Sequence, residues 1–194
     1  MHEQVDNSPI TGRLPDAAFA LADCAAEPPA PRLAHHSGAA IAAVRLDPAA
    51  AVVALNAYRA GKGLKPVRLD PALTAMADAQ AKAMASGNVL SHDVAGAFPA
   101  RLAASGIDTW KAGENLGGGY MSLAEAMTGW RESSAHNANL LIAEGTRLGI
   151  AIAKNPDTQY GVYWAMEIAA EPAPPTSRPE GAFMSLSGGA AQPR

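Results

Sequence analysis

The sequence predicts an α+β fold in which several helices precede a C-terminal β-hairpin. Apolar residues recur at helical spacing between residues 47 and 130, whereas apolar and small residues alternate between 148 and 168. Asp-Pro pairs and glycines frame the helical segments as start and stop signals. An Asn155-Pro156-Asp157 turn separates the two alternating segments. Together these observations predict helices packed on a small antiparallel sheet.

The composition predicts one globular domain between two tails. The chain has 194 residues, of which 48% are hydrophobic, and a formal charge of −3. Residues 47–170 are expected to form the domain, whereas the Ala/Pro-rich residues 1–46 and the Pro/Gly/Ser-rich residues 171–194 are expected to be flexible. The near-neutral charge argues against a nucleic-acid partner, and no apolar run approaches the roughly 20 residues of a transmembrane helix. The single cysteine, Cys24, excludes an internal disulfide framework.

Two Asp-Pro pairs predict the starts of the first two helices. At Asp47-Pro48 and at Asp70-Pro71, an N-cap acceptor precedes a proline at the first helical position. The first of these helices is expected to end at Gly61-Lys62-Gly63 and the second at Gly87-Asn88. Both segments carry apolar residues at helical spacing, so each is expected to bury one face.

Two shorter helices are expected to follow. Residues 98–105 form a short helical segment that Gly106 closes. Ser122 and Glu125 form a capping box, which predicts that a fourth helix begins there.

The C-terminal part of the domain is expected to be an antiparallel hairpin with one buried face. Leu148, Ile150 and Ile152 alternate with small residues. Apolar residues then occupy every second position in the next segment, at Tyr160, Val162, Trp164, Met166 and Ile168. Trp164, in the middle of this segment, is expected to be a core residue.

Two histidines and a Gly-Glu-Asn segment are the candidate functional residues. His92 and His136 are the histidines of the predicted domain, and Glu114 lies in Gly113-Glu114-Asn115. Imidazole is the commonest metal ligand and the side chain that titrates nearest neutral pH. If the three side chains converge, they form a polar pocket able to hold a divalent metal. The alternative is a structural, hydrogen-bonded pair of histidines that anchors loops over the sheet.

Neighbouring residues do not complete a catalytic set. Glu132 precedes His136 by four positions, so the two share a face if they belong to one helix, but Ser133-Ser134 can break that helix. Ser91 lies beside His92 and is expected to be a turn or cap residue, because a triad is defined by geometry and not by adjacency.

Arginines and glycines near these residues are expected to have structural roles. Arg59 and Arg101 are expected to tie the sheet or a helix end rather than to bind a substrate. Gly117-Gly118-Gly119 lacks the Lys-Ser/Thr of a phosphate-binding loop, so a flexible turn beside the pocket is expected there.

The chain carries an ordered set of short motifs across nearly all of residues 50–170. They are Leu55-Asn56-x-x-Arg59 with Gly63-Leu64-x-Pro66, Leu90-Ser91-His92, Phe98-x-x-Arg101 with Gly106-Ile107, Ala112-Gly113-Glu114-Asn115-Leu116, Trp130 to His136, Asn139-Leu140-Leu141, Leu148-Gly149-Ile150 and Tyr163-Trp164. This set resembles the CAP superfamily, also called the SCP-like extracellular domain, which cysteine-rich secretory proteins, venom allergens and plant pathogenesis proteins share. The single cysteine and the short loops resemble its bacterial branch.

The resemblance implies a three-layer α-β-α sandwich with a small central antiparallel sheet and a central cavity. That cavity is expected to be lined by His92, Glu114, Glu132 and His136, with His92, His136 and Glu114 as candidate zinc ligands. The chain departs from the family pattern at Ser133, which stands where a second glutamate is expected, and Glu132 lies one residue earlier. Met166 lies near a position where a polar residue is common in the family.

Three functions are compatible with the sequence. The first is a secreted or envelope-associated binding module for a small ligand, a lipid or a protein partner, as the resemblance implies. The second is a zinc-dependent, peptidase-like hydrolase in which His92 and His136 hold the metal and Glu114 is a ligand or the general base. The third is a cell-envelope structural protein tethered by its Pro-rich tails. The expected location is extracytoplasmic, and Leu21-Ala22-Asp23-Cys24 is a weak lipoprotein signal.

Overall fold

The computed structural model of the chain describes residues 18–21 and 36–172. The predictions for Cys24, for most of the N-terminal segment and for residues 173–194 lie outside the described residues. Within the described part, no helix is both long enough and apolar enough to cross a lipid bilayer.

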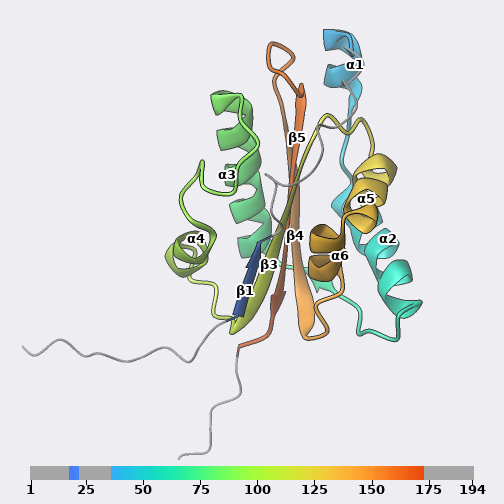
Figure 1. The fold of residues 1–194 in the computed structure, drawn as a ribbon, viewed down its shortest axis with the longest axis vertical. Helices are drawn as coiled ribbons and strands as arrows, with labels where there is room; N and C mark the ends of the chain where they lie inside the picture. The colour runs from blue at the N-terminus through green and yellow to red at the C-terminus, as the bar shows by residue number, and fades with distance from the viewer. Residues whose placement is uncertain (1–17, 22–35, 173–194) are drawn as a thin grey trace, which may run out of the picture.

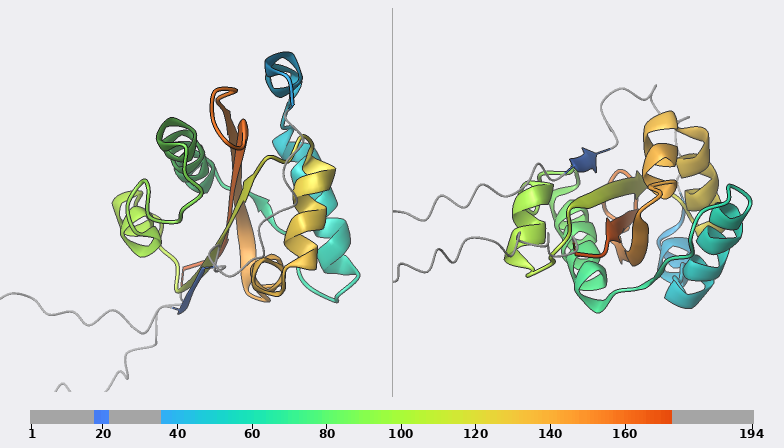
Figure 2. Two further views of the ribbon diagram at one scale, coloured as in Figure 1. Left: turned by 45° about the horizontal axis from the view of Figure 1, so that its top comes forward. Right: turned by 90° about the horizontal axis from the view of Figure 1, so that it is seen from below.

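The protein is a three-layer sandwich in which a sheet lies between two layers of helices (Figure 1). One layer contains α3 (Pro71–Gly87) and α4 (Phe98–Ala104), as the two further views in Figure 2 also show. The opposite layer contains α2 (Pro48–Ala60), α5 (Leu123–Glu132) and α6 (Ser134–Leu140). This architecture confirms the α+β, α-β-α sandwich expected from the sequence.

The sheet has the strand order β1-β3-β5-β4-β2. Its centre is antiparallel and consists of β3 (Lys111–Gly118), β5 (Val162–Ala170) and β4 (Gly145–Lys154). The edge strands β1 (Ala18–Leu21) and β2 (Arg68–Leu69) pair in parallel with β3 and β4. The described sheet is therefore mixed, with the expected antiparallel hairpin β4–β5 at its centre.

The Asp-Pro signals begin the two long helices as expected. Asp47 Oδ1 accepts a hydrogen bond from the Ala49 amide, and Asp70 Oδ1 accepts one from the Ala72 amide, each at 2.9 Å. Asn88 ends α3 in the left-handed conformation, with φ 49°, which asparagine tolerates better than most residues. These local signals fix where α2 and α3 start and where the loop that carries His92 begins.

The two shorter helices also lie where the sequence predicts them. Ser122 Oγ accepts a hydrogen bond from the Glu125 amide at 3.2 Å and caps α5. The extended backbone of Ser133 separates α5 from α6. Glu132 and His136 therefore belong to different helices and do not share the face that one continuous helix would give them.

The hairpin is buried on both faces rather than on one, because a helical layer covers each side of the sheet. All nine residues of β5 are buried. Trp164 packs toward α2 and α5 and is fully buried, which confirms it as a core residue, whereas Tyr163 packs toward α3. Small residues of β4 face α3, and a Cβ atom at Gly149 would overlap the backbone of Leu73. This close approach brings α3 directly over the centre of the sheet.

Two elements lie before residue 47, where the sequence indicated only a flexible segment. These are β1 and the short helix α1 (Gly38–Ala43), which lies beside the turn between β4 and β5 (Figure 1). Ile41 and Val44 are buried against the main core, and Lys154 Nζ donates hydrogen bonds to the carbonyls of Ala42 and Val44. A six-residue helix is too short to produce a recognisable period in the sequence.

The glycines after Asn115 belong largely to a strand and not to a flexible turn. Gly117 and Gly118 are the last residues of β3, and aromatic rings occupy the space that their side chains would need. A Cβ atom at Gly117 would overlap Tyr120, and one at Gly118 would overlap Tyr160. Only Gly119, with φ 81°, has the left-handed backbone of a turn.

Candidate functional site

Glu114 is the centre of a buried polar cluster on the α3–α4 side of the sheet. It lies in the middle of β3, and its side chain is fully buried. Successive side chains of a strand point to opposite faces. Ala112 and Leu116 pack with the residues under α3 and α4, so Glu114, which lies between them, faces the same layer.

Both carboxylate oxygens of Glu114 have a partner within the protein. Oε1 is 2.7 Å from His92 Nδ1, and Oε2 is 2.6 Å from Arg101 Nη2. Because a carboxylate only accepts hydrogen bonds, the geometry assigns the donated proton to Nδ1 of His92. A buried carboxylate is stable only when it is paired and hydrogen-bonded, and Arg101 supplies the compensating charge.

Arg101 also fixes the loop that carries His92. Its Nε donates to the Gly96 carbonyl at 2.8 Å, and its Nη2 donates to the His92 carbonyl at 3.2 Å. From α3, Gln80 Nε2 donates to the Ser91 carbonyl at 2.6 Å. Arg101 therefore has the expected structural role and is also part of the polar cluster around Glu114. Ser91 Oγ accepts a hydrogen bond from the Asp93 amide, which agrees with the turn role expected for it.

Glu167 is a second buried carboxyl group in this cluster, and it was not among the candidates from the sequence. It is the cross-strand neighbour of Glu114 in the β3–β5 pair, and its side chain is fully buried. Arg101 Nη1 lies 3.8 Å from Glu167 Oε1. The signal available in the sequence is a single acidic residue in an otherwise apolar strand, on the face opposite to Trp164 and Met166.

Burial, followed by the negative charge of Glu114, raises the pKa of Glu167 well above its ordinary value. Arg101 acts in the opposite direction but does not cancel these effects. The folded protein therefore keeps the Glu167 proton at a pH where the unfolded chain has lost it. The resulting contribution to stability is complete below the ordinary glutamate pKa and is lost as the pH rises toward the raised value.

Replacement of Glu167 by glutamine is accordingly expected to stabilise the protein at pH 8 and to leave it unchanged near pH 4. Each unit of pKa elevation corresponds to about 1.4 kcal/mol, so a gain above about 1 kcal/mol is expected at pH 8. Urea denaturation between pH 4 and pH 8 measures the difference. Glu132→Gln, at an exposed glutamate, is the matched control. A Glu167→Gln variant with the wild-type pH dependence would show that Glu167 is ionised in the folded state.

His136 lies in α6, which belongs to the helical layer on the other side of the sheet from α3 and α4 (Figure 1). It is buried in α6, where its backbone carbonyl accepts a hydrogen bond from Asn115 Nδ2 at 3.0 Å. Asn115 follows Glu114 in the strand, so these two side chains point to opposite faces. His136 Nδ1 is 2.8 Å from Ser133 Oγ, at the break between α5 and α6.

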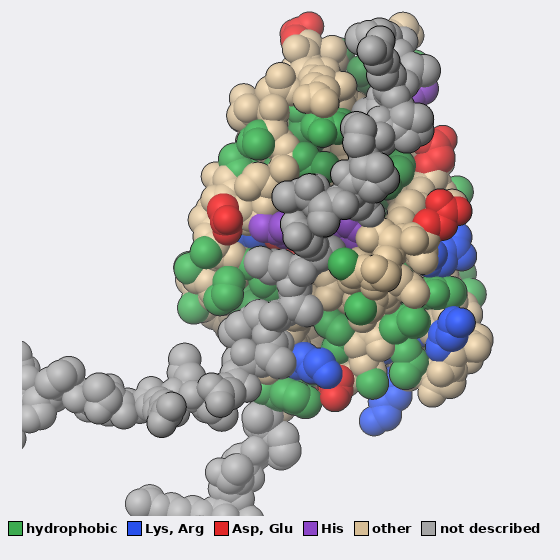
Figure 3. Space-filling model, in the orientation of Figure 1, with side chains coloured by type: hydrophobic (Ala, Val, Ile, Leu, Met, Phe, Trp, Pro, Cys, Tyr) green, Lys and Arg blue, Asp and Glu red, His purple; other side chains and the backbone are tan. Residues whose placement is uncertain are grey.

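Of the four residues that were expected to line one cavity, His92 and Glu114 are hydrogen-bonded to each other. His136 is buried within α6, and Glu132 is exposed at the end of α5. Figure 3 shows histidine side chains at the surface near the middle of one face of the molecule.

Each oxygen of Glu114 accepts a hydrogen bond, one from His92 and one from Arg101, and His136 lies in α6, in the opposite helical layer. Among the described residues, no group of three or more His, Cys, Asp or Glu side chains is arranged to hold a metal. The zinc site remains a prediction.

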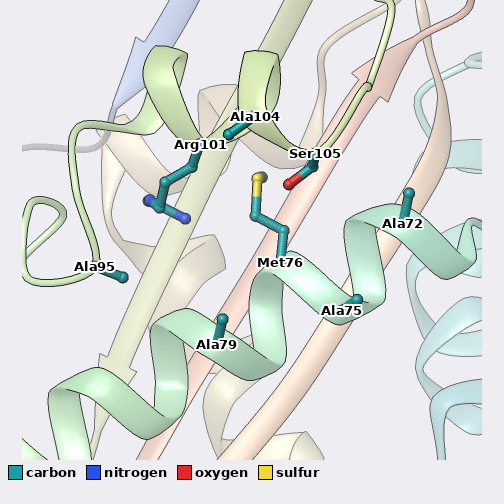
Figure 4. A pocket seen from close by; sticks show the side chains of 8 residues that line it. All are labelled: Ala72, Ala75, Met76, Ala79, Ala95, Arg101, Ala104 and Ser105. Carbon is teal, nitrogen blue, oxygen red and sulfur yellow. The ribbon is translucent and has the colours of Figure 1, made fainter.

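An open apolar groove adjoins the buried cluster. It lies between α3 and α4, and its cavity volume is about 380 Å³ (Figure 4). The lining residues are five alanines with one methionine, one serine and one arginine: Ala72, Ala75, Ala79, Ala95, Ala104, Met76, Ser105 and Arg101. Because Arg101 lines the groove and also binds Glu114, the groove and the polar cluster share one side chain.

The family model described as "CAP: Cysteine-rich secretory protein family" matches residues 52–168, which is more than half of the chain. No curated protein sequence matches the chain.

Several solved bacterial structures share the fold. An extracellular protein containing an SCP domain from Bacillus anthracis str. Ames has 24% identity and a TM-score of 0.57, over 63% of this chain and 40% of that one. A cysteine-rich secretory protein from Staphylococcus aureus has 17% identity and a TM-score of 0.52, over 63% and 38%. An outer surface protein from Borrelia burgdorferi has 17% identity and a TM-score of 0.57, over 65% and 96%. The chain therefore matches less than half the length of the first two proteins, and identities this low show similarity of fold.

Proposed function

The chain belongs to the cysteine-rich secretory protein (CAP) family, and from its site we propose that it is an extracytoplasmic binding module and not a metal-dependent hydrolase. The observation that carries this proposal is the contrast between two neighbouring features. The buried carboxylate of Glu114 is closed by His92 and Arg101, whereas the apolar groove beside it is open.

The closed cluster supports a structural role for the family glutamate. A general base must reach a substrate proton, and a metal ligand must be accessible to the ion. In Glu114 each oxygen accepts a hydrogen bond from within the protein, and the side chain has no contact with solvent. These contacts hold the loop that precedes α4 against the sheet and so shape one wall of the groove.

The groove supports the binding role. Small-molecule sites are commonly concave and mostly apolar, with volumes of about 300–1,000 Å³ and a few polar groups that orient the ligand. The groove between α3 and α4 has this size and this kind of lining (Figure 4). Hydrophobic side chains also come to the surface around α4 in Figure 3.

An extracytoplasmic location is proposed from the family and from the proteins that share the fold. Two of those proteins are described as an extracellular protein and an outer surface protein. Fractionation of the native cells, with an antibody against the chain, tests the location. Recovery of the protein in the cytoplasmic fraction alone would contradict it.

The binding role is tested by identifying the molecules that copurify with the protein. Organic extraction and mass spectrometry are expected to find small apolar molecules bound to the wild type and at least tenfold less in Ala79→Leu, which fills the groove. Ala79 is exposed on α3, where leucine is a good helix former, so the variant is expected to fold. Ala57→Leu, on the exposed face of α2, is the matched control. A wild-type protein that yields no bound molecule would count against the proposal.

A further inference from the structure

The groove between α3 and α4 exposes apolar surface to solvent. Ala72, Ala75 and Ala79 line it from α3 and are exposed, and Ala104 lines it from α4. Apolar surface of this kind is stabilised when another apolar group removes it from water. The distance along α3 from Ala72 to Ala79 is about 10 Å, because an α-helix rises about 1.5 Å per residue. An extended chain covers the same length with about four residues, at about 3.3 Å per residue.

The last strand of the sheet ends beside this groove. Figure 4 shows Ala72 and Ser105 at the same end of the groove. The carbonyl of Ala170, the last residue of β5, accepts hydrogen bonds from Thr109 Oγ1 at 3.0 Å and from Arg147 Nε at 3.1 Å. These bonds fix the point at which the chain leaves the sheet.

Arg147 connects that point to both walls of the groove. Its Nη2 donates to the Asp108 carbonyl at 2.6 Å, and its Nη1 lies 3.5 Å from Asp70 Oδ2. Asp108 follows Ser105, at the end of α4, by three residues, and Asp70 is the N-cap of α3, two residues before Ala72. The chain therefore leaves β5 close to the end of the groove that Ala72 and Ser105 form.

The sequence after β5 contains one apolar segment on a tether of sufficient length. Phe183, Met184 and Leu186 are the large apolar residues after Pro172, and residues 181–187 carry no charge. The tether, residues 171–180, has ten residues, four of which are prolines. At about 3.1 Å per residue in the extended polyproline conformation it spans about 30 Å, more than the length of the groove. A short linker of this kind holds a segment at an effective concentration on the order of millimolar.

We propose that residues 183–186 of the same chain occupy the groove between α3 and α4 when no ligand is bound, so that a ligand must displace them. The segment lies in extended form along the alanines of α3, with Met184 and Leu186 on the same side of the chain. This proposal rests on the binding role proposed above and adds the regulation of that groove.

Paramagnetic relaxation tests the position of the segment in the full-length protein. A nitroxide attached at Ser187→Cys, in a Cys24→Ser background, is expected to broaden the backbone amide signals of Ala75 and Ala79 much more than that of Ala57 on α2. Ala79→Leu fills the groove and is expected to abolish the broadening at Ala75. When spin-labelled chains are mixed with ¹⁵N-labelled chains that carry no nitroxide, no broadening is expected, because the contact is within one chain.

Titration with Nile red, a neutral apolar dye, tests the competition. The dye is expected to bind at least fivefold more tightly to the triple variant Phe183→Ser, Met184→Ser, Leu186→Ser than to the wild type, because the segment no longer competes for the groove. The double variant Ala190→Ser, Ala191→Ser changes the same tail outside the segment, and its affinity is expected to equal that of the wild type. The fluorescence of the dye measures the binding.

The other outcomes overturn the proposal and show how far the failure extends. No broadening on α3, or broadening that persists in Ala79→Leu, shows that the segment is not in the groove. Broadening in the mixed sample shows that the segment of a second copy is bound instead. Equal dye affinity in the wild type and the triple variant overturns the competition alone if Ala79→Leu still weakens dye binding at least tenfold. If the dye binds neither protein and no molecule copurifies with the wild type, the proposed binding role fails as well.

Discussion

Replacement of Arg101 by methionine is expected to lower the free energy of unfolding by about 3–5 kcal/mol, the usual effect of breaking a buried ion pair. Arg101 supplies the only guanidinium bonded to Glu114 among the described residues, and both side chains are at least nine-tenths buried. Methionine keeps much of the side-chain length but leaves the carboxylate of Glu114 without a compensating charge. Urea denaturation at pH 7 measures the change.

A matched pair of variants separates charge compensation from packing. Arg68→Met removes an exposed ion pair with Glu171 and is expected to cost less than about 1 kcal/mol. Adding Glu114→Gln to the Arg101→Met protein removes the uncompensated charge and is expected to recover most of the loss. A loss below 1 kcal/mol in Arg101→Met, or no recovery in the double variant, would contradict the pairing.

Replacement of Arg59 by methionine is expected to have an effect of similar size, about 3–5 kcal/mol, because several buried carbonyls lose their donor together. Arg59 is fully buried in α2, and its guanidinium donates hydrogen bonds at 2.8–3.0 Å. The acceptors are the backbone carbonyls of Lys65, Leu140, Ile142 and Gly145. One side chain therefore holds the loop after α2 and the connection between α6 and β4.

Arg59→Lys separates the guanidinium geometry from the positive charge. A lysine ammonium is a single point with rotatable donors and cannot reach carbonyls from all these segments at once. The variant is expected to lose most of the stability that the methionine variant loses, as measured by thermal and urea unfolding. Wild-type stability in Arg59→Lys would show that charge alone is sufficient at this position.

Local signals in the sequence predicted most of the fold. The caps at Asp47 and Asp70 and the capping box at Ser122 act over three or four residues, so they can be read without tertiary information. The alternating pattern of the hairpin is equally local. The two buried faces of β5 were not predicted, because alternation of large and small residues does not reveal which helices cover each side. The edge strand β2, with two residues, is too short to leave a pattern.

The sequence indicated residues of the candidate site, but it did not indicate which of their side chains bind each other. The Gly-Glu-Asn segment indicated Glu114, and the motif with Arg101 indicated a structural arginine, but the sequence could not show that the two meet. Glu167 was missed because its cross-strand partner, Glu114, lies on another strand and 53 positions earlier in the sequence. Whether His136 shares a helix with Glu132 depends on the break at Ser133, which local sequence left open.

The proposed function requires that Arg101 and His92 close the family glutamate and that Glu114 holds no metal ion. Zinc titration of the full-length protein by calorimetry at pH 7 tests this claim most directly. We expect no saturable binding by the wild type, and the same result for the His92→Ala, His136→Ala double variant. Saturable zinc binding by the wild type that disappears in the double variant would contradict the closed state of Glu114 and restore the hydrolase hypothesis.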